Sequence, residues 1–61
     1  MKIYRPYAEV LDFAHGERGK TYYGYYHNEE KAKEKVKELK KQFENRPEVL
    51  NVDYMIEETV D

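Results

Sequence analysis

The sequence predicts an α+β domain in which a three-stranded sheet, in strand order 2-1-3, carries one helix on one face. The chain has 61 residues, which is the size of a single domain over residues 1–61. Two extended stretches flank a glycine-containing turn, and a Lys/Glu-rich stretch with a narrow apolar stripe precedes a final alternating stretch. The order β-β-α-β, with a right-handed crossover through the helix, places the first strand between the other two.

Residues 2–14 are predicted to form the first strand because tyrosine and branched aliphatic residues recur along them. Pro6 lies in this stretch and has no N–H to donate, so we expect a bulge or an edge position near it. Residues 15–19 are predicted to form the turn, because Gly16 and Gly19 can adopt positive φ at no steric cost.

Residues 20–26 are predicted to form the second strand of a hairpin. Its four tyrosines alternate between two faces, with Tyr22 and Tyr26 on one and Tyr23 and Tyr25 on the other. Gly24 lies between Tyr22 and Tyr26, and a glycine allows another backbone to come close. We therefore expect the helix to pack on the Tyr22 face and to leave the Tyr23 face bare.

Asn28 is predicted to be the N-cap of a helix that runs to about residue 44. Glu29 and Glu30 place negative charge in the first turn, which suits the helix dipole, and Pro47 prevents continuation. One apolar stripe faces the sheet: Ala32, Val36, Leu39 and Phe43.

Residues 48–58 are predicted to form a half-buried third strand, because apolar and polar residues alternate cleanly along them. The face expected to meet the helix consists of Leu50, Val52, Tyr54 and Ile56. Residues 59–61 are expected to fray.

One helix can cover only one face of this sheet, so the other face is predicted to meet another molecule. The residues expected on this interface, with a dimer or with another partner, are Tyr7, Leu11, Tyr23, Tyr25 and Met55. A chain this short has a small core, and it has no cysteine for a disulfide. We therefore expect a homodimer.

The composition limits the other partners. The net charge is −2, and no basic row was found to alternate with the second-strand tyrosines, so nucleic acid is disfavoured. No apolar run approaches the roughly 18 residues of a membrane span. The first residues lack the apolar segment of a signal peptide, and Met1 indicates a complete small gene product. We therefore expect no membrane association and a cytoplasmic location.

No residue pattern indicates a reaction centre. The chain has no cysteine or serine, so the common nucleophile–histidine–acid arrangements cannot be built. His15 and His27 lack metal-ligand spacing, and residues 16–20 lack the ending of a phosphate-binding P-loop. The sequence predicts no enzyme, no metal and no cofactor.

Two segments carry a resemblance. Residues 24–32 read Gly-Tyr-Tyr-His-Asn-Glu-Glu-Lys-Ala, and residues 54–58 read Tyr-Met-Ile-Glu-Glu. With its short hairpin and capped Glu/Lys helix, the chain resembles many small phage- and prophage-encoded proteins of unknown role. That class includes inhibitors of bacterial anti-phage defence of the anti-CRISPR and anti-Hachiman types. The resemblance implies a compact, non-enzymatic binder, often a homodimer, that acts on a host protein in the host cell cytoplasm.

Three functions follow as hypotheses. The first is a protein-binding module, as an inhibitor of a host defence system that acts by steric occlusion. The second is a single-stranded nucleic-acid binder that stacks bases on exposed tyrosines. The third is a small structural homodimer with no further ligand.

Overall fold

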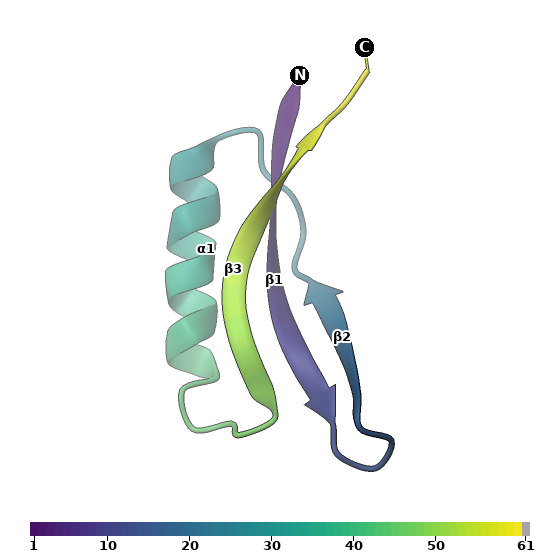
Figure 1. The fold of residues 1–61 in the computed structure, drawn as a ribbon. Helices are drawn as coiled ribbons and strands as arrows, with labels where there is room; N and C mark the ends of the chain where they lie inside the picture. The colour runs from purple at the N-terminus through teal and green to yellow at the C-terminus, as the bar shows by residue number, and fades with distance from the viewer. Residues whose placement is uncertain (61) are drawn as a thin grey trace.

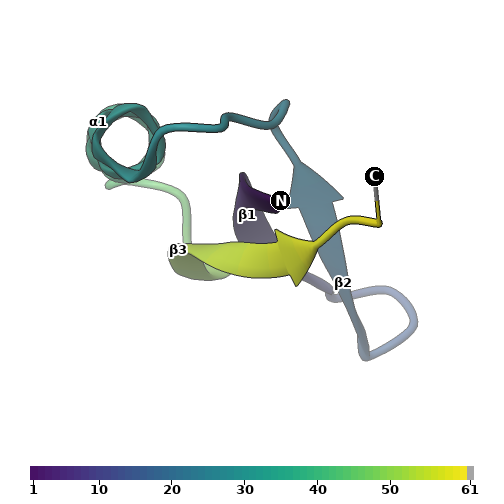
Figure 2. The same ribbon diagram turned by 90° about the horizontal axis from the view of Figure 1, so that it is seen from above.

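The computed structural model describes residues 1–60 (Figure 1). Its elements are β1 (Lys2–Asp12), β2 (Glu17–Tyr22), α1 (Glu29–Gln42) and β3 (Val49–Glu58). The strands form an antiparallel sheet in the order β2-β1-β3, and α1 contacts β1 and β3 but not β2 (Figure 2). The predicted α+β fold, its strand order and its single helix are confirmed for the described residues.

The helix forms where the sequence predicts it. The Asn28 side-chain oxygen accepts a hydrogen bond from the Glu30 N–H at 2.8 Å, which satisfies one of the free donors of the first turn. The Tyr54 hydroxyl donates to the Glu29 carboxylate at 3.2 Å and so links β3 to the start of α1. Burial, and then the negative charge of Glu29, raise the pKa of Tyr54.

The core is small and lies between α1 and the inner face of β1 and β3. Its buried hydrophobic side chains are short or branched: Ala8, Ala32, Val36, Leu39 and Val52. Partly buried residues, among them Val49 and Phe43, pack around it. The apolar stripe of the helix is therefore placed as predicted.

The third strand departs from the predicted alternation. Val52 pairs with Ala8, and Val49 pairs with Val10, so β3 holds one residue more than β1 over this stretch. The extra residue forms a β-bulge that turns Val49 toward the core and leaves Leu50 43% exposed. Leu50 was therefore wrongly predicted to meet the helix.

The far end of β3 also differs. Ile56 pairs with Tyr4 but is 52% exposed, because this end of β3 crosses β1 and curves away from α1 (Figure 1). Thr59 does not fray as predicted: its N–H and its hydroxyl both donate to the Met1 carbonyl, at 2.7 and 3.0 Å. Asp61 lies outside the described residues.

The second strand ends at Tyr22, four residues earlier than predicted. The irregularity expected near Pro6 is found here, because the ladder between β1 and β2 stops beside this residue. Tyr23 still donates its N–H to the Pro6 carbonyl at 2.9 Å, and an isolated bridge then joins Tyr4 to Tyr26. The segment between Tyr22 and Tyr26 holds one residue more than the facing segment of β1, so these two tyrosines lie on opposite faces.

Gly24 makes this extra residue possible. Its φ of 81° lies in the left-handed region, which side chains with a Cβ rarely adopt. A Cβ built on Gly24 would meet nothing within 4 Å, so the helix does not pack on it and that prediction was wrong.

Gly24→Ala is expected to lower the free energy of unfolding by about 1 kcal/mol, because alanine is strained at positive φ. Urea unfolding followed by circular dichroism measures this loss. Gly19→Ala is the matched control, since Gly19 has equally open surroundings and no positive φ. An equal loss in both variants would show that the backbone conformation of Gly24 is not the cause.

Within residues 1–60, no helix combines the length and apolar character that a bilayer crossing requires.

Candidate binding face

The sheet face opposite α1, here called the open face, is built from alternate residues of all three strands. Residues paired across antiparallel strands share a face, so the pairing registers define its three columns. The central column, from β1, is Ile3, Arg5, Tyr7, Glu9 and Leu11. The β2 column is Arg18, Lys20 and Tyr22. The β3 column is Asn51, Asp53, Met55 and Glu57.

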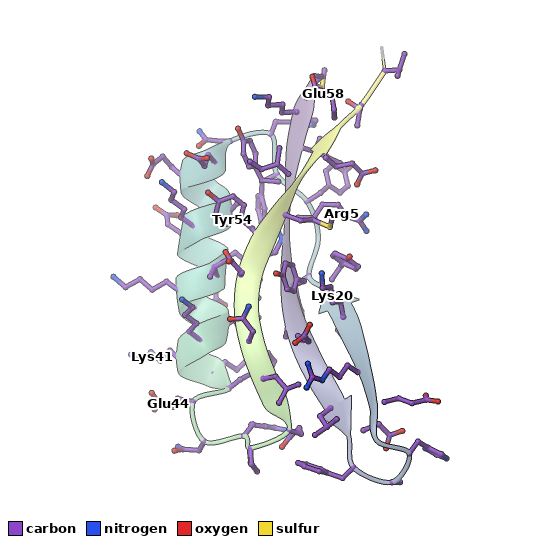
Figure 3. The ribbon with its side chains drawn as sticks, viewed as in Figure 1. Arg5, Lys20, Lys41, Glu44, Tyr54 and Glu58 are labelled. Carbon is purple, nitrogen blue, oxygen red and sulfur yellow. The ribbon has the colours of Figure 1, made fainter. Side chains whose placement is uncertain are left out.

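Four side chains of the open face form a cation–aromatic cluster: Arg5, Tyr7, Lys20 and Tyr22. The rings of Tyr7 and Tyr22 meet edge to face, with centroids 6.1 Å apart. The Arg5 guanidinium carbon lies 4.2 Å from the centre of the Tyr22 ring. The Lys20 ammonium lies 4.7 Å from the centre of the Tyr7 ring. Figure 3 shows Arg5 and Lys20 on the side of the molecule away from α1. These contacts hold the two rings in defined positions on a solvent-facing surface.

Charge is divided across the open face. Arg18 and Lys20 make the β2 column basic, whereas Asp53 and Glu57 make the β3 column acidic. Between the two columns, Arg5 forms an ion pair with Glu57 at 3.0 Å. The face therefore carries opposite charge along its two sides.

Three of the predicted interface residues lie on this face. Tyr7 and Leu11 are in the central column and Met55 is in the β3 column, and all three are half-buried. Tyr25 lies beyond the end of β2 and is 64% exposed, with its ring edge-on to His27 at 6.0 Å. Alternation from the Tyr4–Tyr26 bridge points Tyr25 toward the open face as well.

Tyr23 was wrongly predicted to lie on the bare face. It packs against the core, with its ring centroid 6.0 Å from that of Phe43, and Tyr22 takes the exposed position instead. The reason is the hairpin register: the pair Asp12–Glu17 closes the turn, and counting back from it sets Tyr22 opposite Tyr7. That turn length is the sequence signal that could have identified Tyr22.

The same register changes the charge of the face. Because Tyr22 lies on the open face, Lys20 and Arg18 follow it at alternate positions. A basic row therefore accompanies Tyr22, and the predicted absence of such a row is wrong.

The hairpin carries an open hollow of about 280 Å³ lined in part by Asp12, Arg18 and Thr21. Among residues 1–60, no group of three or more His, Cys, Asp or Glu side chains lies close enough together to hold a metal ion.

Asp12 stabilises the hairpin turn. Its carboxylate is hydrogen-bonded to the His15 ring at 2.8 Å and accepts the Ala14 N–H at 3.0 Å. The hydrogen bond to His15, and then the backbone donors, lower the pKa of Asp12 from its ordinary 3.8. Because the folded-state pKa is the lower one, this contribution to stability is present above pH 3.8 and is lost as pH falls through the folded-state pKa.

Asp12→Asn is therefore expected to reduce the fall in the free energy of unfolding at acidic pH, because asparagine does not titrate. Urea midpoints measured from about pH 6 down to about pH 2 check this. His15→Ala should reduce this fall only in part, since the Ala14 N–H still favours the carboxylate. An identical fall in the wild type and Asp12→Asn would contradict the assignment.

Comparisons with protein-family models, curated proteins and solved structures found no match for this chain.

Proposed function

We propose that this chain is a non-enzymatic protein-binding module and that the open face is its binding surface. The observation that carries the proposal is the cation–aromatic cluster on the side of the sheet that α1 leaves uncovered. Tyrosine and arginine are enriched at the energetic centres of protein interfaces, because they combine large contact area with hydrogen-bonding groups.

The amount of exposed surface supports this proposal. The folded chain exposes 4741 Å², whereas a folded monomer of 7.4 kDa is expected to expose about 4,200 Å². The core is small, and the exposed large apolar side chains include Tyr22 on the open face. Contact with a partner protein would remove this surplus surface from water and would stabilise the fold.

The proposed mechanism is steric occlusion. Packing of Arg5 on Tyr22 and of Lys20 on Tyr7 fixes these side chains before any partner arrives. A preformed surface loses little side-chain entropy on binding, so its contact area contributes more fully to affinity. The bound module then covers part of its partner and blocks access to it, with no chemical step.

The resemblance to small phage proteins supports a narrower form of the proposal, in which the partner is a host defence protein. Capture from bacterial lysate by the immobilised chain tests it. Arg5→Ala is expected to abolish capture, because it removes the cation over Tyr22. Arg46→Ala is the matched control, since Arg46 lies outside the open face, beside the Phe43 ring. Equal capture by both variants would count against the open face.

Single-stranded nucleic acid is a second candidate, favoured by the row of Arg18, Lys20 and Tyr22. Cations can contact phosphates while tyrosine rings stack on bases. It ranks lower because Asp53 and Glu57 share the face and would repel phosphates. Fluorescence anisotropy with oligonucleotides tests it: binding should weaken steeply with salt and should be reduced in Lys20→Ala. No binding at low salt would remove this candidate.

A further inference from the structure

We infer that the occupant of the open face is a second copy of this chain, related by a two-fold axis that runs parallel to β1. This inference rests on the part of the proposed function that makes the open face a protein-binding surface, and it names a second copy, in place of a host protein, as the occupant of that face. The observation behind it is the division of charge, with the basic Arg18 and Lys20 along β2 and the acidic Asp53 and Glu57 along β3. Three cations and three carboxylates balance over the whole face: Arg5, Arg18 and Lys20 against Glu9, Asp53 and Glu57.

The strand order determines how two such faces can meet. When two sheets stack face to face about a two-fold axis parallel to their strands, each β2 lies over the β3 of the other copy. Because such an axis preserves height along the strands, Lys20 lies level with Asn51 of the other β3 and about 7 Å along the strand from Asp53, within reach of a lysine side chain. An axis perpendicular to the strands would instead place each β2 over the other β2, so that no basic column lies against an acidic one. The charges therefore favour the parallel axis.

The central column can occupy the middle of this interface. Tyr7 and Leu11 supply apolar surface there, and Met55 adds to it from β3. The two charged members of the column have neighbours of opposite charge within their own chain. Arg5 is paired with Glu57, and Glu9 faces Lys20 across the ladder. Neither Arg5 nor Glu9 would therefore be covered without a neighbour of opposite charge.

Strand length and strand spacing determine the size of this interface. The three strands lie about 5 Å apart, and the longest, β1, has 11 residues at about 3.3 Å each, so the open face is long and narrow. An interface on it is a small one, below the roughly 800 Å² that each partner contributes to a standard interface. Sheets packed face to face lie about 10 Å apart, which side chains of this size can fill.

Light scattering and a pair of charge reversals test the inference. The wild type is expected to have a mass near twice 7.4 kDa. Lys20→Glu sets acid against the partner's acidic column, and Asp53→Lys sets base against its basic column. Each variant alone should dimerise about tenfold more weakly or worse, since like charges facing each other cost more than about 1.4 kcal/mol.

Mixing the two variants should restore the dimer, because Glu at position 20 then lies near Lys at position 53, and Lys20 lies near Asp53, each one same-face step apart. Lys37→Glu, on the exposed side of α1, is the matched control and should dimerise like the wild type. Circular dichroism verifies that each variant is folded. Restoration by mixing supports the parallel axis, because the perpendicular arrangement does not pair these two positions.

A wild-type monomer at high micromolar concentration would overturn the second copy as occupant. So would a dimer that neither reversal weakens, or one that mixing fails to restore. Lysate capture distinguishes these outcomes from failure of the proposed function. A monomer whose lysate capture still depends on Arg5 keeps the open face as a protein-binding surface with another partner, whereas a monomer without such capture removes both.

Discussion

Leu39→Ala is expected to leave a large fraction of the molecules unfolded at 25 °C. Leu39 is 1% exposed and packs among Ala8, Val36 and Val52. Removing a fully buried leucine side chain costs about 2–5 kcal/mol, because apolar contacts are lost and a cavity remains. A domain of 61 residues has a total free energy of unfolding of about 3–9 kcal/mol, so this single loss approaches its whole stability. Urea unfolding followed by circular dichroism measures the change.

Leu50→Ala is the matched control, since it removes the same atoms from an exposed position. We expect a cost below about 1 kcal/mol for it, because the bulge in β3 turns Leu50 away from the core. The pair of variants thus tests the register of β3 as well as the core. Equal losses at both positions would contradict the bulge and would restore simple alternation along this strand.

The helix could be predicted because several independent local signals agree on it. Asn28 caps its first turn, and the spacing of the apolar stripe matches one helical face. Each of these signals depends on residues within a few positions of one another. The strand order followed equally well, because the handedness of the crossover and the short hairpin leave few alternatives.

The faces of the strands could not be predicted in the same way. Alternation divides the residues of a strand between two faces. One extra residue in the strand moves every residue beyond it to the opposite face. Leu50 and Gly24 are such points, and each arises from the pairing of two strands rather than from the strand alone. The sequence of β3 alternates cleanly through its bulge, so nothing in the strand itself marks the exchange.

The candidate site was predicted in part for this reason. Tyr7 and Leu11 lie on β1, whose odd positions keep their face throughout, and Met55 lies in the part of β3 beyond the bulge, where the odd positions from Asn51 to Glu57 share the open face. Tyr22 and Lys20 were missed because their face depends on the length of the hairpin turn. Contacts such as that of Arg5 with Tyr22 join different strands, so sequence spacing alone does not reveal them.

Tyr23→Ala is the second substitution expected to have a large effect. Tyr23 packs on the core and against Phe43, so its removal should cost about 2–4 kcal/mol, less than for a fully buried aromatic residue because Tyr23 is half-buried. Tyr22→Ala removes the neighbouring ring, which is 38% exposed and contacts Tyr7 and Arg5 on the open face. Tyr22→Ala should lower the free energy of unfolding of a single chain by about 1 kcal/mol. Denaturation of both variants compares them directly.

The concentration dependence separates the two tyrosines further. If the open face binds a second copy, Tyr22→Ala weakens association, so its loss of stability relative to the wild type should grow with protein concentration. The loss from Tyr23→Ala arises inside one chain, between the core and Phe43, and should stay nearly constant. Thermal unfolding at two concentrations a hundredfold apart distinguishes these cases. A larger loss for Tyr22→Ala than for Tyr23→Ala at low concentration would contradict the hairpin register, because only the opposite register places Tyr22 against the core.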